Sequence, residues 1–71
     1  SVFPNPTQGS IYVQPAANAH ITIYSSLGKL VVSEQLMAGE RREFNISGSG
    51  IYFVRYQVNH TMGIFKLIVA D

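Results

Sequence analysis

The chain has 71 residues, the size of one domain, and a domain this small buries only about 60% of the surface that its unfolded chain exposes. It contains no cysteine, which excludes disulfide bonds and thiolate metal sites. Five basic and four acidic residues give a net charge of +1. The sequence therefore lacks the clustered excess of Lys and Arg that is typical of proteins binding nucleic acid or anionic membranes.

A turn with two prolines opens the chain at Pro4-Asn5-Pro6. Each proline fixes its own φ near about −65° and biases the residue before it toward extended geometry. Asn5 and Gly9 tolerate the positive φ that tight turns require. The pattern predicts that a short extended segment at residues 2–3 ends in a turn before a second one begins at Ile11.

Turn signals recur along the whole chain, about every 8 to 12 residues, which is the spacing of short antiparallel strands. Between them lie segments rich in Val, Ile, Tyr, Phe and Thr, which favour strands. A helix competes at residues 30–37, but β-branched Val31 and Val32 and the short length favour a strand. We predict an all-β, small immunoglobulin-like antiparallel β-sandwich of six to seven strands, near residues 10–14, 19–25, 29–36, 41–46, 51–58 and 63–69, with 2–3 as the seventh.

Alternation with a period of two assigns side chains to the two faces of each strand. The predicted core residues are Ile21, Ile23, Tyr52 and Val54. His20 falls on the opposite, outer face. Consecutive apolar residues at 30–32 and 67–69 blur the pattern, so these strands either are covered on both sides or present an apolar outer face.

The sequence contains few residues arranged as a catalytic or metal-binding site requires. His20 and His60 have neither a carboxylate nor a second histidine at ligand spacing, so we interpret them as a surface residue and a turn residue. No serine lies in a nucleophile elbow, and residues 47–50 read as a β-turn. We expect no catalytic residue, metal or cofactor, and we assign four carboxylates to solvation: Glu34, Glu40, Glu43 and Asp71.

Four sequence blocks occur in order along the chain: residues 3–9 with the two prolines, 23–32 with Gly28-Lys29, 48–56 with Gly50-Ile51-Tyr52, and 65–69 with Lys66. Together they resemble the C-terminal sorting domain of proteins exported by the type IX (Por) secretion system of Bacteroidetes. Two positions depart from that pattern, since Ser25 stands where an acidic or amide residue is common and Ala70-Asp71 where many members have a basic end. Lys66 is thus the one cation in the last strand.

The resemblance implies what the domain does. It would span residues 1–71 as the tail of a longer exported precursor, with its Sec signal elsewhere. The type IX apparatus would read it in the periplasm and move the attached cargo across the outer membrane to the cell surface or the medium. A sortase usually then cuts before the domain and joins the cargo to lipopolysaccharide, whereas some members stay uncleaved as anchors. The family-motif residues expected to carry recognition are Pro4, Asn5, Pro6, Gly9, Gly28, Lys29, Gly50, Ile51, Tyr52, Lys66 and Val69.

The expected partners are the translocon and sortase proteins, the N-terminal cargo, which can itself be an enzyme, and a second copy through edge pairing or swapping. Nucleic acid is not expected. Docking by strand addition at an open sheet edge is the available physical mechanism, with the last strand as the favoured edge. The alternative function is an immunoglobulin-like or fibronectin-like adhesion or spacer module, which predicts tandem copies inside a parent chain.

Overall fold

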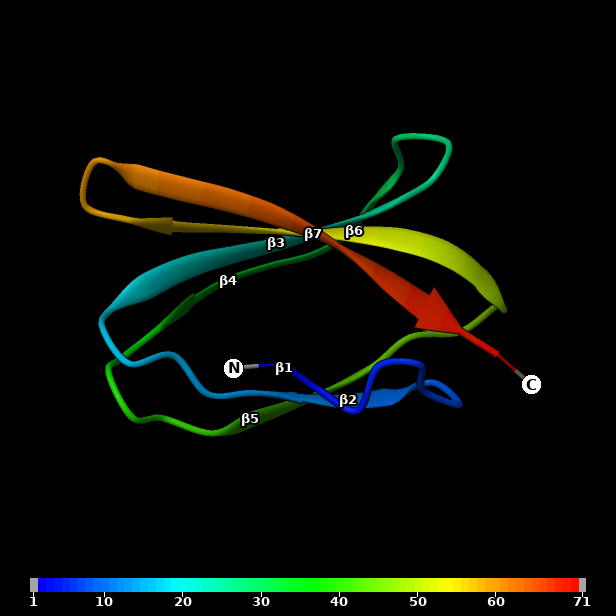
Figure 1. Ribbon diagram of the computed structural model, residues 1–71, viewed down its shortest axis with the longest axis horizontal. Helices are drawn as coiled ribbons and strands as arrows, with labels where there is room; N and C mark the ends of the chain where they lie inside the picture. The colour runs from blue at the N-terminus through cyan, green and yellow to red at the C-terminus, as the bar shows by residue number, and fades with distance from the viewer. Residues whose placement is uncertain (1, 71) are drawn as a thin grey trace.

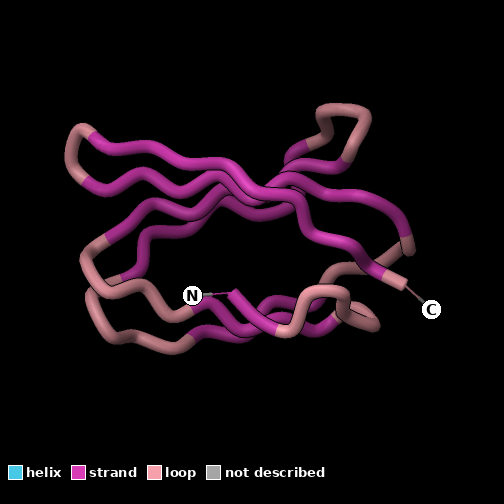
Figure 2. The backbone as a smooth tube through the Cα atoms, in the orientation of Figure 1, coloured by secondary structure: helices cyan, strands magenta, loops and turns pink. Residues whose placement is uncertain are grey.

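The computed structural model describes residues 2–70. Within this range the chain forms strands joined by turns and loops, with no helix (Figure 2). The competing helix at 30–37 is therefore wrong, because those residues pair as a strand. The strands are β1 (Val2–Phe3), β2 (Ser10–Val13), β3 (Ala19–Ser25), β4 (Leu30–Leu36), β5 (Arg42–Asn45), β6 (Gly50–Val58) and β7 (Thr61–Val69).

The strands form two sheets that face each other (Figure 1). The small sheet has the order β1-β2-β5 and the large sheet the order β4-β3-β6-β7, and every named pair is antiparallel. This arrangement confirms the predicted small antiparallel β-sandwich, with residues 2–3 as the seventh strand. In the large sheet, β4 and β7 are the edges.

The β6–β7 hairpin is the longest paired unit, running from Gly50 opposite Val69 to Val58 opposite Thr61. Strand β7 begins two residues earlier than predicted, because the pairing with β6 continues through Met62 to Thr61. A Cβ on Gly63 would lie 2.2 Å from the ring of its cross-strand partner Tyr56. The glycine therefore leaves room for the tyrosine ring, which also packs against Phe65.

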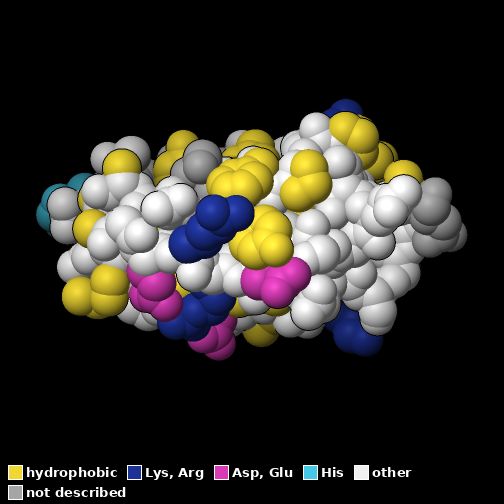
Figure 3. Space-filling view, turned by 90° about the horizontal axis from the view of Figure 1, so that it is seen from below, with side chains coloured by type: hydrophobic (Ala, Val, Ile, Leu, Met, Phe, Trp, Pro, Cys, Tyr) yellow, Lys and Arg dark blue, Asp and Glu magenta, His cyan; other side chains and the backbone are white. Residues whose placement is uncertain are grey.

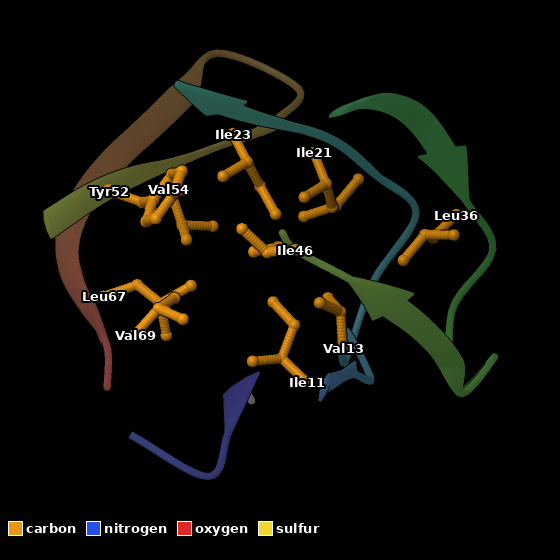
Figure 4. Close-up of a cluster of buried hydrophobic side chains, with 11 residues drawn as sticks. Ile11, Val13, Ile21, Ile23, Leu36, Ile46, Tyr52, Val54, Leu67 and Val69 are labelled. Atoms are coloured by element: carbon orange, nitrogen blue, oxygen red, sulfur yellow. The ribbon is translucent and has the colours of Figure 1, made fainter. Parts of the chain in front are cut away.

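The hydrophobic core lies between the two sheets (Figure 4). All four predicted core residues are buried, which confirms the alternation of β3 and β6. The other buried residues of the strands follow the same period of two. In β7, for example, Leu67 and Val69 point into the core, whereas Lys66 and Ile68 point outward. The buried hydrophobic residues are Ile11, Val13, Ala19, Ile21, Ile23, Leu36, Ile46, Tyr52, Val54, Leu67 and Val69.

The apolar stretches with a blurred pattern leave an apolar outer face, the second of the two alternatives. Leu30 is 53% exposed and Ile68 39% exposed, although Leu36 at the other end of β4 and Leu67 beside Ile68 are fully buried. The outer face of the large sheet therefore carries exposed hydrophobic side chains.

An ion-pair cluster links the β4 edge of the large sheet to β5 of the small one. The Arg42 guanidinium lies 2.7 Å from Glu34 and also pairs with Glu40. The hydrogen bond from the Met37 amide, followed by the one from Arg42, lowers the pKa of Glu40 below its ordinary value. Any contribution from this group is therefore present above the ordinary carboxyl pKa and is lost as the pH falls through the lowered pKa. Because the pair is exposed, its contribution is small.

Candidate recognition site

The Pro-Asn-Pro turn binds the outer edge of β7. The side-chain amide of Asn5 donates from Nδ2 to the carbonyl O of Lys66 at 2.9 Å and accepts at Oδ1 from the amide of Ile68 at 3.1 Å. The backbone of Thr7 continues the contact, donating to Ile68 at 2.9 Å and accepting from Ala70 at 2.8 Å. We call residues 5–7 the clasp.

The clasp determines which part of the β7 edge is open. Since Ile68 directs its amide and carbonyl away from β6, the alternation of an antiparallel ladder directs those of Met62 and Ile64 away from β6 too. The clasp occupies only residues 66–70 of this edge. The last strand does lie at a sheet edge, as the strand-addition mechanism requires, but only its first half, residues 61–65, is open.

Asn5 acts through its side chain and not through a special backbone conformation. Within residues 2–70, the one non-glycine residue with a positive φ is Asn59, so the tolerance of Asn5 for that region is not used. Gly9 does use it, with a φ of +123°, and a Cβ there would lie 3.1 Å from the carbonyl O of Ile46. The sequence signals the turn but does not reveal the partner of the Asn5 amide.

The substitution Asn5→Ala is expected to lower the free energy of unfolding by about 1–2 kcal/mol, because two hydrogen bonds to β7 are lost. It should also speed hydrogen exchange at the Ile68 amide. Urea unfolding and amide exchange followed by NMR measure the two effects. Gln8→Ala, an exposed change in the same loop, is the control. Equal effects of the two variants would contradict a specific role for the clasp.

The second motif forms the β3–β4 turn. Gly28 has a φ of +87° and donates its amide to the carbonyl O of Ser25 at 2.9 Å. The Lys29 amide donates to Oγ of Ser25 at 3.1 Å. Ser25 departs from the family pattern, and its hydroxyl is the hydrogen-bond acceptor inside this turn. The side chain of Lys29 is exposed.

The third motif begins β6. Tyr52 is buried, and its hydroxyl donates toward the carbonyl O of Gly48 at 2.7 Å and that of Ser47 at 3.0 Å, which ties the preceding turn to the core. Its neighbour Ile51 is 44% exposed on the outer face. Tyr52 thus stabilises the fold, while Ile51 is available for contact.

The structure brings the sequence motifs together at one end of the sandwich (Figure 1). Ser25, which begins the β3–β4 turn, lies opposite Tyr52, Tyr52 lies opposite Leu67, and Gly50 lies opposite Val69. The clasp reaches β7 at the same end. At this end, the motif residues with exposed side chains are Pro4, Asn5, Pro6, Lys29, Ile51 and Lys66.

The opposite end holds an apolar cavity of about 450 Å³. Aliphatic side chains line most of it, and its only titratable group is the Tyr56 hydroxyl; the lining residues are Val2, Val13, Pro15, Ala16, Ala17, Ala19, Ile21, Val54, Tyr56, Val58 and Phe65. Such a lining lacks the paired acid, base or nucleophile that catalysis requires.

The titratable residues are dispersed across the described part of the chain. His20 shares a hydrogen bond of 3.0 Å with the hydroxyl of Ser33 on the outer face, and His60 lies in the β6–β7 turn. Glu43 accepts a hydrogen bond from Ser10. Residues 2–70 contain no group of three His, Asp or Glu side chains placed to hold a metal ion. Asp71, assigned to solvation, lies outside the described residues.

A family model described as "Secretion system C-terminal sorting domain" matches residues 1–70. The chain belongs to this family. The sorting domain is thus a signal for type IX secretion, attached to an N-terminal cargo and directing export across the outer membrane to the cell surface or the medium. The family is not one of enzymes. No curated protein matches the chain. No helix in residues 2–70 has the length and hydrophobicity to cross a membrane.

Proposed function

We propose that the end of the sandwich where the motifs gather is read by the type IX apparatus after the domain has folded in the periplasm. The observation that supports this is the convergence of three motifs, distant in sequence, around the C-terminal half of β7. If the motifs served folding alone, their exposed side chains would have no reason to gather at one end of the domain.

The motif residues divide into two groups in this proposal. Gly9, Gly28, Gly50, Tyr52 and Val69 build the turns and the core, whereas Lys29 and Lys66 contact the apparatus directly. The open half of β7, residues 61–65, lies toward the other end of that strand and supports a second contact by strand addition, in which main-chain hydrogen bonds supply affinity and alternate side chains supply selectivity. The same open edge, and that of β4, support pairing with a second copy of the domain.

The later steps belong to the same proposal. A sortase cuts before the domain, and the cargo is joined to lipopolysaccharide or, where the domain is kept, is anchored by it. The sorting domain itself has no catalytic role in these steps, and any enzymatic activity resides in the cargo.

The test is a fusion of residues 1–71 behind a Sec signal and a fluorescent reporter, expressed in a type IX-competent bacterium with and without a working translocon. We expect the reporter on the surface or in the medium only when the translocon works. Retention in the periplasm of both strains would contradict the proposal and favour the adhesion or spacer module.

A further inference from the structure

The outer face of the β6–β7 hairpin combines exposed hydrophobic residues with two cations. The side chains of Ile51 and Phe53 on β6 are 44% and 40% exposed, and those of Ile64 and Ile68 on β7 are 61% and 39% exposed. In the register, Phe53 lies opposite Lys66, and Arg55 lies opposite Ile64. We call these six residues the hairpin face.

The two cations of the hairpin face lie close together. Arg55 and Lys66 are diagonal neighbours across β6 and β7, which places their Cβ atoms about 7–8 Å apart. Neither forms an ion pair within residues 2–70, where both ion pairs belong to Arg42. A carboxylate from another molecule that lies between them would relieve the repulsion of the two like charges.

The acidic residues lie elsewhere on the molecule. Glu34 and Glu40 surround Arg42 at the β4–β5 side, and Glu43 lies on the small sheet. Figure 3 looks onto the small-sheet side and shows acidic side chains gathered there among basic and hydrophobic ones. On the outer face of the large sheet, the described part of the chain has no carboxylate.

A polar hollow of about 270 Å³ lies beside the hairpin face. Arg55 lines it together with His20, Ser33 and Gln57, and none of its lining residues is acidic. A hollow lined by a guanidinium and by hydrogen-bonding groups fits the side chain of a partner's Asp or Glu.

We propose that the hairpin face is a docking surface for a protein partner that presents apolar side chains flanked by carboxylates. This inference rests on the proposed function. It adds a contact surface for the secretion apparatus that includes Phe53, Arg55 and Ile64, which are not among the family-motif residues. A second copy does not fit, because stacking this face on itself would place cations against cations. An anionic membrane fits less well than a protein, since two cations supply little attraction to anionic lipid.

The test uses the reporter fusion with matched pairs of exposed substitutions. Arg55→Glu and Ile64→Ser change the hairpin face, while Arg41→Glu on the small-sheet side and Met37→Ser in the loop between β4 and β5 are exposed controls outside the hairpin face and the motif end. Because single central side chains often dominate an interface, we expect export to fall about tenfold or more in the first pair and to change less than about twofold in the second. Thermal unfolding of the purified fusions should show all four folded.

The outcomes separate this inference from the function on which it rests. Normal export of Arg55→Glu and Ile64→Ser would overturn the docking surface and leave the sorting function standing. If the unsubstituted fusion is not exported, the sorting function itself fails. A photo-crosslinker at position 64 should link the fusion to a translocon-dependent protein, through a peptide that contains Asp or Glu, and one at position 37 should not.

Two further measurements would also overturn the inference. The first is binding of the purified fusion to phosphatidylglycerol vesicles that Arg55→Glu abolishes, which would make the hairpin face a membrane surface. The second is dimerisation in analytical ultracentrifugation that Phe53→Ser, on the inner strand β6 and away from the open edge of β7, abolishes, which would make the hairpin face a contact between copies.

Discussion

Leu67→Ala is expected to lower the free energy of unfolding by about 3 kcal/mol, within the range measured for truncation of fully buried leucines. Leu67 has no exposed surface and packs in the core from β7, an edge strand. Because β7 has a neighbouring strand on one side only, little of the surrounding structure can move in to fill the cavity that the truncation leaves. A domain of 71 residues has a total stability of about 4–10 kcal/mol. One substitution should therefore remove a large share of it.

Urea unfolding followed by circular dichroism measures this loss, and the midpoint of thermal unfolding should fall by about 4–8 °C for each kcal/mol. Ile64→Ala is the matched control on the same strand, since Ile64 is 61% exposed and its truncation should cost less than about 0.5 kcal/mol. Equal losses in the two variants would contradict the inward orientation of the odd-numbered residues of β7.

Local patterns were sufficient to predict the strands and the core. The period of two in β3 and β6 placed Ile21, Ile23 and Val54 inside. The opposite face is polar in β3 and mixed in β6, where Phe53 alternates with Arg55 and Gln57. At residues 30–32 both faces are apolar, so the pattern alone could not orient that strand. In the structure the pairing of β3 with β4 shifts register between Ile23 and Tyr24, so Leu30 lies on the outer face although Leu36 of the same strand packs in the core.

The contacts that define the recognition end depend on pairing between distant segments, which no local pattern encodes. The hydrogen bonds of Asn5 to β7 join opposite ends of the chain, and an Asn between two prolines signals only a turn. The hairpin face was missed for a related reason. Arg55 and Lys66 each look like an ordinary surface cation, and only the register of β6 and β7 makes them neighbours on a face without a carboxylate.

Deletion of residues 65–69 is expected to abolish export of the reporter fusion completely. The deletion removes Leu67 and Val69 from the core, the groups on β7 that the clasp binds, and the exposed cation Lys66. Fractionation should find the reporter in the periplasm, and proteolysis should find the remaining domain unfolded. A five-residue Gly-Ser insertion after Ala17, which is exposed in the β2–β3 loop at the opposite end of the sandwich, changes the chain length by the same number of residues and should preserve the fold and export. Normal export of the truncated fusion would end the proposal that β7 carries the sorting signal.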